Sequence, residues 1–141
     1  MRKFTQEEYD AFEVRQGVKI CPSGDYSAVE RFDDHASYGY GSEFGDGAKL
    51  GSFSTFGFGC VFGENVVIGR NCVISHGASF CRDAKLERSV QVGDMSVFGP
   101  GLECGRWCTF GENVNFGKGA RIGYGIRHGR GCVFEDAVFE R

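Results

Sequence analysis

Three histidines and seven cysteines are the side chains of this 141-residue sequence that could carry chemistry near neutral pH. A histidine is the commonest general base in enzymes, and histidine and cysteine together are the commonest ligands of zinc. The histidines are His35, His76 and His128, and they lie far apart in the sequence. What they can do therefore depends on the elements that position them.

Those elements come from a six-residue repeat that runs from Phe44 to Ile122. Every sixth residue in this range is apolar, and the residue that follows it is usually Gly. We call these positions the anchors: Phe44, Leu50, Phe56, Phe62, Ile68, Ile74, Phe80, Leu86, Val92, Phe98, Cys104, Phe110, Phe116 and Ile122. The residue four after an anchor is usually small or aliphatic, as in Ala48 and Val66. A fixed short period of this kind is typical of a solenoid, in which each repeat packs on its neighbours.

Each repeat predicts a short strand followed by a corner. The small residue and the next anchor are two positions apart, so in a strand both face the core while the residue between them points outward. The residue three after an anchor is mostly Gly, Asn or Asp, which tolerate positive φ, so we expect the chain to turn there. The exceptions at this corner position are Phe53, Ser89, Met95 and Trp107. Strands and corners repeated in this way predict a prism of parallel strands.

The pattern resembles the hexapeptide repeat of the left-handed β-helix superfamily, of the bacterial transferase hexapeptide type, over about residues 26 to 139. In that family an aliphatic residue is followed by Gly, two variable residues, a small residue and another variable one. The resemblance implies an all-β solenoid, a left-handed parallel β-helix in which three repeats form one triangular coil, with about six coils here. This chain departs from the family by placing Phe at many anchors, where Leu, Ile or Val is usual.

Residues 1 to 25 do not follow the repeat, and we expect them to cap the β-helix formed by residues 26 to 141. Thr5 with Glu8 three residues later is a capping box, and Gly17 is a helix stop. The first segment is therefore predicted to be a short amphipathic helix over about residues 5 to 16.

A strand over Val18 to Ile20 is predicted to lead from this helix into the solenoid. Tyr9 and Phe12 of the helix are expected to cover the open end of the prism, because the terminal repeats of solenoids need a cap. A helix that binds a partner is the alternative.

The cysteines fit the repeat better than a disulfide or metal framework. Four fall on the small inward position and one falls on an anchor: Cys60, Cys72, Cys108 and Cys132, and Cys104. No two cysteines are eighteen residues apart, which is the spacing of residues stacked in adjacent coils. We therefore expect reduced core thiols in a cytoplasmic protein, without a metal site. Cys21 and Cys81 lie outside these positions and are the candidates for exposure.

Composition narrows the range of functions. The formal net charge of −3 has the wrong sign for a nucleic-acid binder and is too small for a mimic of nucleic acid. No apolar run is long enough for a membrane span or a signal peptide. An aromatic content of 14 % is ample for a core in a single domain. We expect a globular protein that binds neither nucleic acid nor a membrane.

The outward residues predict a surface for contact with another molecule. Sorted by coil, they form three columns: Val61, Ser79, Val97, Asn115 and Val133; Val67, Lys85, Glu103, Arg121 and Phe139; and Val73, Gln91, Thr109 and Arg127. The first column has no charge beyond Glu43 at its foot and carries three valines, which favours an oligomer face. Phe53 and Trp107 fall in one corner column, and exposed aromatic residues favour a contact there as well. Because the family usually assembles as parallel trimers, we expect a homotrimer.

The resemblance also suggests an enzyme. Many members of the superfamily transfer an acyl group from coenzyme A, with a histidine at a subunit boundary as general base. His76 is the candidate in this chain, because it stands at a corner where Ser75 interrupts the Gly rule. In these enzymes a protruding loop and extra terminal segments commonly complete the acyl-donor site. The repeats from Phe44 onward contain no inserted loop, and we expect no such terminal segments here.

Hexapeptide-repeat carbonic anhydrases suggest a zinc site, for which three histidines must meet across an interface. His76 and His128 are nearly three coils apart, roughly 14 Å at about 4.8 Å per layer. They cannot share a metal ion, so we expect none.

A non-catalytic binding protein is the function we favour from the sequence. A loop-free prism with an uncharged column, corner aromatics and no assembled catalytic set suits a protein that binds or sequesters a protein or small ligand. The chain also weakly resembles short hexapeptide-repeat proteins of phages and mobile elements, which implies an inhibitor of a host system. A trimeric acyltransferase that uses His76 and a coenzyme A thioester is the alternative.

Overall fold

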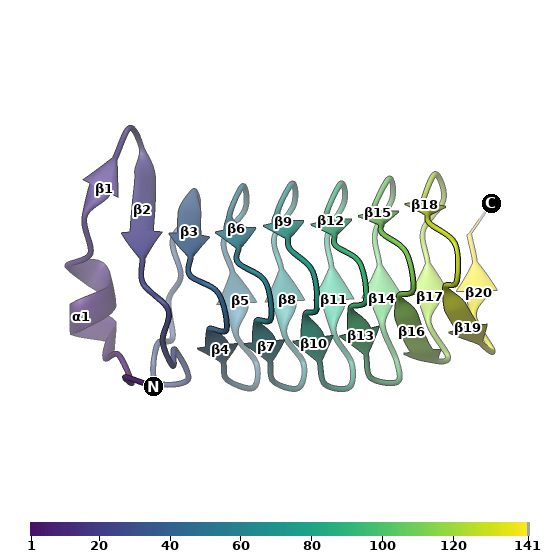
Figure 1. Ribbon diagram of the computed structural model, residues 1–141, viewed down its shortest axis with the longest axis horizontal. Helices are drawn as coiled ribbons and strands as arrows, with labels where there is room; N and C mark the ends of the chain where they lie inside the picture. The colour runs from purple at the N-terminus through teal and green to yellow at the C-terminus, as the bar shows by residue number, and fades with distance from the viewer. Residues whose placement is uncertain (141) are drawn as a thin grey trace.

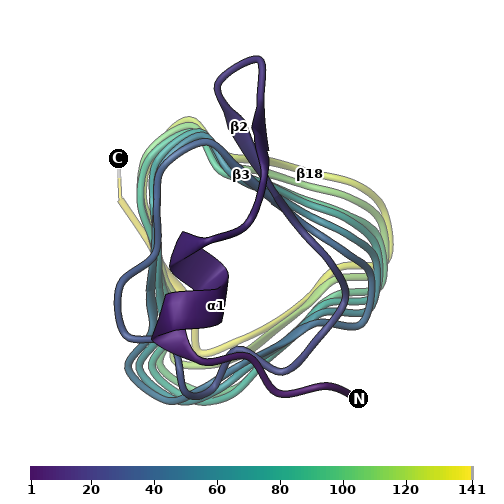
Figure 2. The same cartoon turned by 90° about the vertical axis from the view of Figure 1, so that its left-hand side faces the viewer.

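The computed structural model describes residues 1–140 and is an all-β solenoid of parallel strands (Figure 1). Within these residues there is one helix, α1 (Gln6–Asp10), at the N-terminal end. The strands lie in three sheets, which form the three sides seen end-on in Figure 2. The architecture is thus the parallel β-helix predicted from the repeat.

The first sheet contains β1 (Val14–Arg15), β2 (Val18–Cys21), β3 (Ala36–Tyr38), β6 (Thr55–Phe56), β9 (Val73–Ile74), β12 (Gln91–Val92), β15 (Thr109–Phe110) and β18 (Arg127–His128). The second sheet contains β4 (Glu43–Phe44), β7 (Val61–Phe62), β10 (Ser79–Phe80), β13 (Val97–Phe98), β16 (Asn115–Lys118) and β19 (Val133–Glu135). The third sheet contains β5 (Lys49–Leu50), β8 (Val67–Ile68), β11 (Lys85–Leu86), β14 (Glu103–Cys104), β17 (Arg121–Ile122) and β20 (Val138–Phe139).

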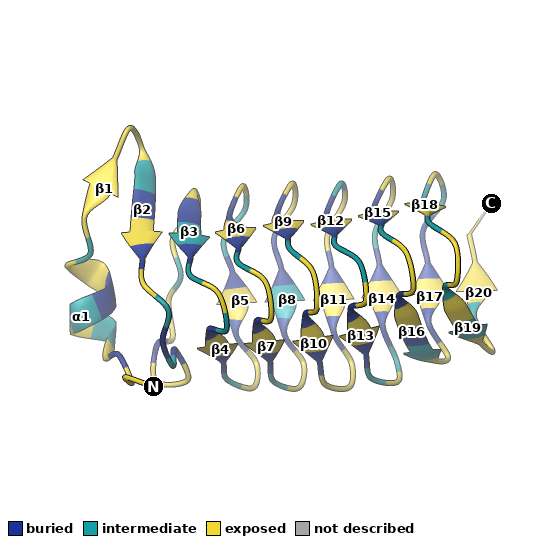
Figure 3. Ribbon diagram, in the orientation of Figure 1, coloured by how far each residue is buried: buried dark blue, intermediate teal, exposed yellow. Residues whose placement is uncertain are grey.

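The register confirms a coil of eighteen residues. Val61 pairs with Ser79, and Ser79 pairs with Val97, so equivalent positions stack directly in successive coils. Six coils of three strands, from β3 to β20, follow the irregular segment that contains β2. In nearly every regular strand the first residue is exposed and the second is buried (Figure 3).

The core contains a stack of aromatic rings along the inner face of the second sheet. Its members are Tyr26, Phe44, Phe62, Phe80, Phe98, Phe116 and Phe134, and successive ring centroids lie 4.3 to 6.2 Å apart. Phe62 and Phe116 are completely buried. Large flat rings are accommodated because the inward positions beside them are small, as at Cys60 and Ala78.

The corner positions turn with positive φ, as the repeat predicts. Asn65, Asn71 and Asn113 all have φ of 57°. Corners occupied by other residue types adopt the same conformation, since Met95 has φ of 59° and Trp107 has φ of 60°. The eighteen-residue register therefore determines the backbone at each corner even where the residue type is unfavourable.

The N-terminal segment differs from the sequence prediction. The capping box of Thr5 and Glu8 is present, but the predicted helix over residues 5 to 16 is wrong because α1 ends at Asp10. Gly17 does not end a helix. It forms, with Gln16, a two-residue turn in which φ is 50° and 81°, and this turn joins β1 to β2 in an antiparallel hairpin.

The cap itself is built by aromatic residues and one lysine. Tyr9 is fully buried, and α1 lies across the end of the prism (Figure 2). The hydroxyl groups of Tyr9 and Tyr38 share a hydrogen bond of 2.8 Å. Lys19 is 4 % exposed, and its Nζ donates to the backbone oxygen atoms of Tyr9 at 2.8 Å and Asp10 at 3.3 Å.

The last coil is one residue shorter than the repeat. Arg121 pairs with Val138, so Val138 and not Phe139 occupies the outward column of the third sheet. Phe139 pairs instead with the anchor Ile122. The cause is an early corner at Asp136, where φ is 52° only two residues after Phe134.

Among the described residues no helix is long and apolar enough to cross a membrane.

Candidate functional site

His76 lies at the corner between the first and second sheets, and its ring has a structural partner. The Nδ1 atom accepts a hydrogen bond from the backbone N–H of Asp94 in the next coil, at 3.0 Å. Asp46 and Asp94 do the same at equivalent corner positions, each accepting from the amide one coil later at 2.8 Å. His76 therefore caps a corner amide, as the aspartates do.

This hydrogen bond bears on the catalytic prediction for His76. A neutral imidazole that accepts at Nδ1 carries its proton on Nε2, which is then a donor. A general base needs an unprotonated nitrogen directed at the substrate, usually with a partner that accepts from the other nitrogen. The Asp94 carboxylate is 3.9 Å from Nδ1, the same nitrogen that accepts the amide. Catalysis by His76 stays a prediction, and it requires the other tautomer.

A shallow groove of about 430 Å³ lies beside His76 on the outer surface of the first sheet. Its walls include Phe58, Val73, Gln91 and Thr109. His76 is the residue with acid–base chemistry among those that line it. The groove can hold a small ligand, but it brings no second catalytic group to the imidazole.

The other histidines lie elsewhere. His35 stacks on Phe53, with ring centroids 5.1 Å apart, and His128 packs beside Phe134 at 5.1 Å. No cluster of three potential metal ligands is present in residues 1–140. The structure therefore does not bring the three histidines together within the chain.

The valines of the contact surface predicted on the second sheet are exposed and lie in one column. Val61, Val97 and Val133 are 41 %, 47 % and 55 % exposed, and they stack in one column through Ser79 and Asn115. We call these five residues the valine column. Isolated exposed valines are common on protein surfaces, but here three of them recur in every second coil of one uncharged column, with Ser79 and Asn115 between them.

Phe53 and Trp107 are also exposed, at 42 % and 51 %. Both lie on the edge between the third and first sheets, which is opposite the second sheet in a three-sided prism. The structure therefore places these aromatics and the valine column on opposite sides of the chain. A single flat contact cannot cover both on the same protomer.

An arginine column on the same edge was not predicted from the sequence. Arg70, Arg88 and Arg106 stand one coil apart, immediately before Asn71, Ser89 and Trp107. Their eighteen-residue spacing was visible in the sequence, but the outward strand columns omit corner residues. The guanidinium of Arg106 lies 4.5 Å from the centroid of the Tyr124 ring, and that of Arg70 lies 5.8 Å from that of Phe53.

The cysteines are free thiols, and most are buried. Burial raises the pKa of Cys60 and of Cys72 to about 11. Cys81 is exposed, but the expectation of exposure was wrong for Cys21, which is 3 % exposed because it faces inward from β2. Thiols with raised pKa values are poor nucleophiles at neutral pH, so they serve as core residues.

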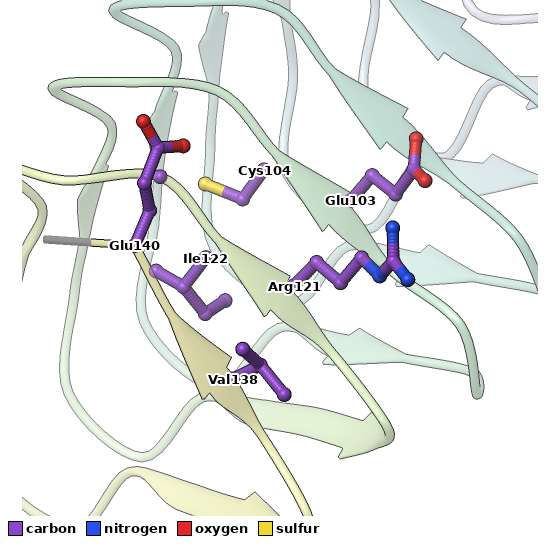
Figure 4. A pocket seen from close by; sticks show the side chains of 7 residues that line it. Glu103, Cys104, Arg121, Ile122, Val138 and Glu140 are labelled. Carbon is purple, nitrogen blue, oxygen red and sulfur yellow. The ribbon is translucent and has the colours of Figure 1, made fainter.

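A second hollow of about 400 Å³ lies on the third sheet near the C-terminal end (Figure 4). Glu103, Arg121 and Glu140 surround it, and Cys104 lies at its inner side. The neighbouring thiol of Cys108 and burial both raise the pKa of Cys104. The thiol is therefore protonated at neutral pH, and the hollow has no activated nucleophile.

Comparisons of the chain with protein-family models, with curated proteins and with solved structures found no match.

Proposed function

We propose that this chain is a non-catalytic β-helix that assembles into a homo-oligomer and binds or sequesters a partner, either a protein or a small ligand. The observation that carries the proposal is the valine column, an uncharged strip on the outside of the second sheet in which exposed valines alternate with Ser79 and Asn115. Contact with a partner or a second copy removes this strip from water, which stabilises an assembly by about 25 cal/mol for each Å² of apolar surface buried. The resemblance to the hexapeptide-repeat family suggests three copies.

The geometry at His76 supports a binding function over the acyltransferase alternative. In that alternative a coenzyme A thioester donates an acyl group while His76 removes a proton from the acceptor. The imidazole instead accepts the amide of Asp94, and among residues 1–140 no carboxylate pairs with its other nitrogen. A sequestering protein, such as an inhibitor of a host system carried by a phage, needs no such group.

Calorimetric titration with acetyl coenzyme A tests the choice between the two functions. We expect no heat of binding at micromolar concentrations. Saturable binding, together with acyl transfer that is lost in His76→Asn, would establish the alternative. Asn is the suitable replacement because its side-chain oxygen can still accept from Asp94 N, as aspartate oxygens do at equivalent corners.

A further inference from the structure

Two edges of the prism differ in charge along their length. The edge between the third and first sheets, which we call the arginine edge, carries Arg70, Arg88 and Arg106 together with Phe53 and Trp107. The edge between the first and second sheets, which we call the acidic edge, carries Asp94 and Glu112 together with Tyr40, Phe58 and His76, and its column continues to Arg130 in the last coil. These two edges border opposite sides of the first sheet.

The arginines are closely stacked and only partly neutralised. The amide of Asn71 donates to the carbonyl of Arg88 at 3.1 Å, and that of Ser89 donates to the carbonyl of Arg106 at 2.9 Å. Successive coils are therefore joined at this edge, with a spacing of about 4.8 Å. Like charges at this separation repel, so acidic groups supplied from outside would stabilise the column.

The acids near these arginines leave Arg88 free. Glu140 lies 3.4 Å from Arg106, and the carboxylate of Glu87 accepts from the backbone amide of Arg70 at 3.1 Å. Within residues 1–140 neither Arg70 nor Arg88 forms a side-chain ion pair. Arg88 is thus the arginine most available to an external carboxylate.

The acidic edge is built in the same way. The amide of Gly77 donates to the carbonyl of Asp94, and the amide of Met95 donates to that of Glu112, each at 2.9 Å. Asp94 and Glu112 therefore stack one coil apart. Closer to the N-terminus, Tyr40 and Phe58 stack with ring centroids 5.2 Å apart.

Opposite charges on the two edges lie at similar heights along the axis of the prism. Asp94 follows Arg88 by six residues, and Glu112 follows Arg106 by six, which is one third of a coil. Each acid therefore stands only about 1.6 Å higher along the prism than its arginine, given a layer spacing of about 4.8 Å.

Aromatic pairs on the two edges also lie at similar heights along the axis. The stacked pair His35 and Phe53 on the arginine edge lies level with the stacked pair Tyr40 and Phe58 on the acidic edge. Both matches occur in one register only when the copies stand side by side and parallel, because an antiparallel copy that pairs the arginines with the acids would separate the two aromatic pairs.

We infer that the arginine edge of one copy docks on the acidic edge of a parallel second copy, pairing Arg88 with Asp94 and Arg106 with Glu112. This contact is heterologous, so repeated use of it closes a ring when the rotation between copies divides a full turn evenly. Arg70 faces His76 and adds no attraction. The inference rests on the homo-oligomer of the proposed function, but it assigns the contact between copies to the edges and leaves the valine column for the partner.

A charge exchange measured by sedimentation velocity tests the pairing. Arg88→Glu should raise the dissociation constant of the assembly by about tenfold or more, since it replaces an ion pair with a repulsion. Asp94→Arg should do the same while also losing the hydrogen bond that Asp94 accepts from the Glu112 amide, and the double variant should regain most of the wild-type affinity. Arg82→Glu is the matched control, because Arg82 occupies the equivalent corner position on the third edge and should leave the assembly unchanged.

The outcomes separate this inference from the proposed function. An assembly unaffected by Arg88→Glu but dissociated by Val97→Lys would overturn edge docking and place the self-contact on the valine column. Failure of the double variant to reassociate, with its thermal unfolding unchanged, would also overturn the pairing. A wild-type monomer that binds poly-glutamate through Arg88 would assign the edge to an acidic protein instead. A monomer without such binding would contradict both proposals.

Discussion

Single residues at the corners show how the repeat constrains the backbone. Asn, Asp and Gly tolerate positive φ, and they occupy most corners of the prism. Met95 and Trp107 adopt the same conformation although their side chains make it costly. Both side chains are exposed, so packing in the core does not explain why these residues occupy strained corners.

Met95 offers a direct measurement of this strain. Its side chain is 61 % exposed, so replacement removes no packing in the core. Met95→Asn should increase the free energy of unfolding by about 0.5–1 kcal/mol, because Asn tolerates positive φ. Urea denaturation measures the change. Gly77→Ala, at a corner with φ of 72°, is the opposite control and should lower stability by a similar amount. Equal stability of Met95→Asn and the wild type would show that the corner is unstrained.

Buried tyrosine and cysteine side chains with raised pKa values should make the free energy of unfolding depend on pH in the alkaline range. Burial raises the pKa of Tyr9 and of Cys21 to about 12, against ordinary values of 10.0 and 9.0. Above pH 9 the unfolded chain therefore loses protons that the folded chain keeps, and the free energy of unfolding falls. Urea denaturation between pH 8 and pH 11 should show a steady decline, and Cys60→Ala should make it shallower. A flat profile would mean that these groups ionise without unfolding.

At the scale of elements, the N-terminal cap shows where local signals fail. The capping box of Thr5 and Glu8 identified the start of α1 correctly. Its end was mispredicted because Gln16 and Gly17 turn a hairpin, a choice decided by pairing of β1 with β2 and not by helix propensity. Lys19 was not recognised either, since a buried lysine is explained only by the carbonyl groups that surround it in three dimensions.

Lys19 is expected to hold the cap on the solenoid. Its ammonium group bonds to carbonyls at the end of α1 and lies 3.3 Å from the carboxylate of Asp33. Lys19→Met keeps the apolar stem but loses these bonds, and should lower the free energy of unfolding by about 2 kcal/mol. Thermal unfolding monitored by circular dichroism tests this. Lys49→Met, on an exposed outward position, should change stability little. Equal effects of the two changes would refute the structural role of Lys19.

At the scale of the whole molecule, the six-residue period predicted most of the fold. Anchors, corners and the eighteen-residue register were predicted because each is a local rule repeated in every coil. The end of the repeat was not, since Asp136 shortens the last corner by one residue without a composition signal. The valine column followed from the period, whereas the arginine edge required attention to corner residues as a surface. The hydrogen bond from Asp94 to His76 could not be predicted, because it depends on the orientation of one ring.

The central claim is that copies of this prism assemble and bind a partner without acyl-transfer chemistry. Native mass spectrometry of the purified wild-type protein tests it most directly, since one spectrum reports both the number of copies and any retained ligand. We expect the mass of a homo-oligomer, with three copies suggested by the family resemblance, and no bound coenzyme A. A monomer at micromolar concentration, or an oligomer that retains coenzyme A, would contradict it.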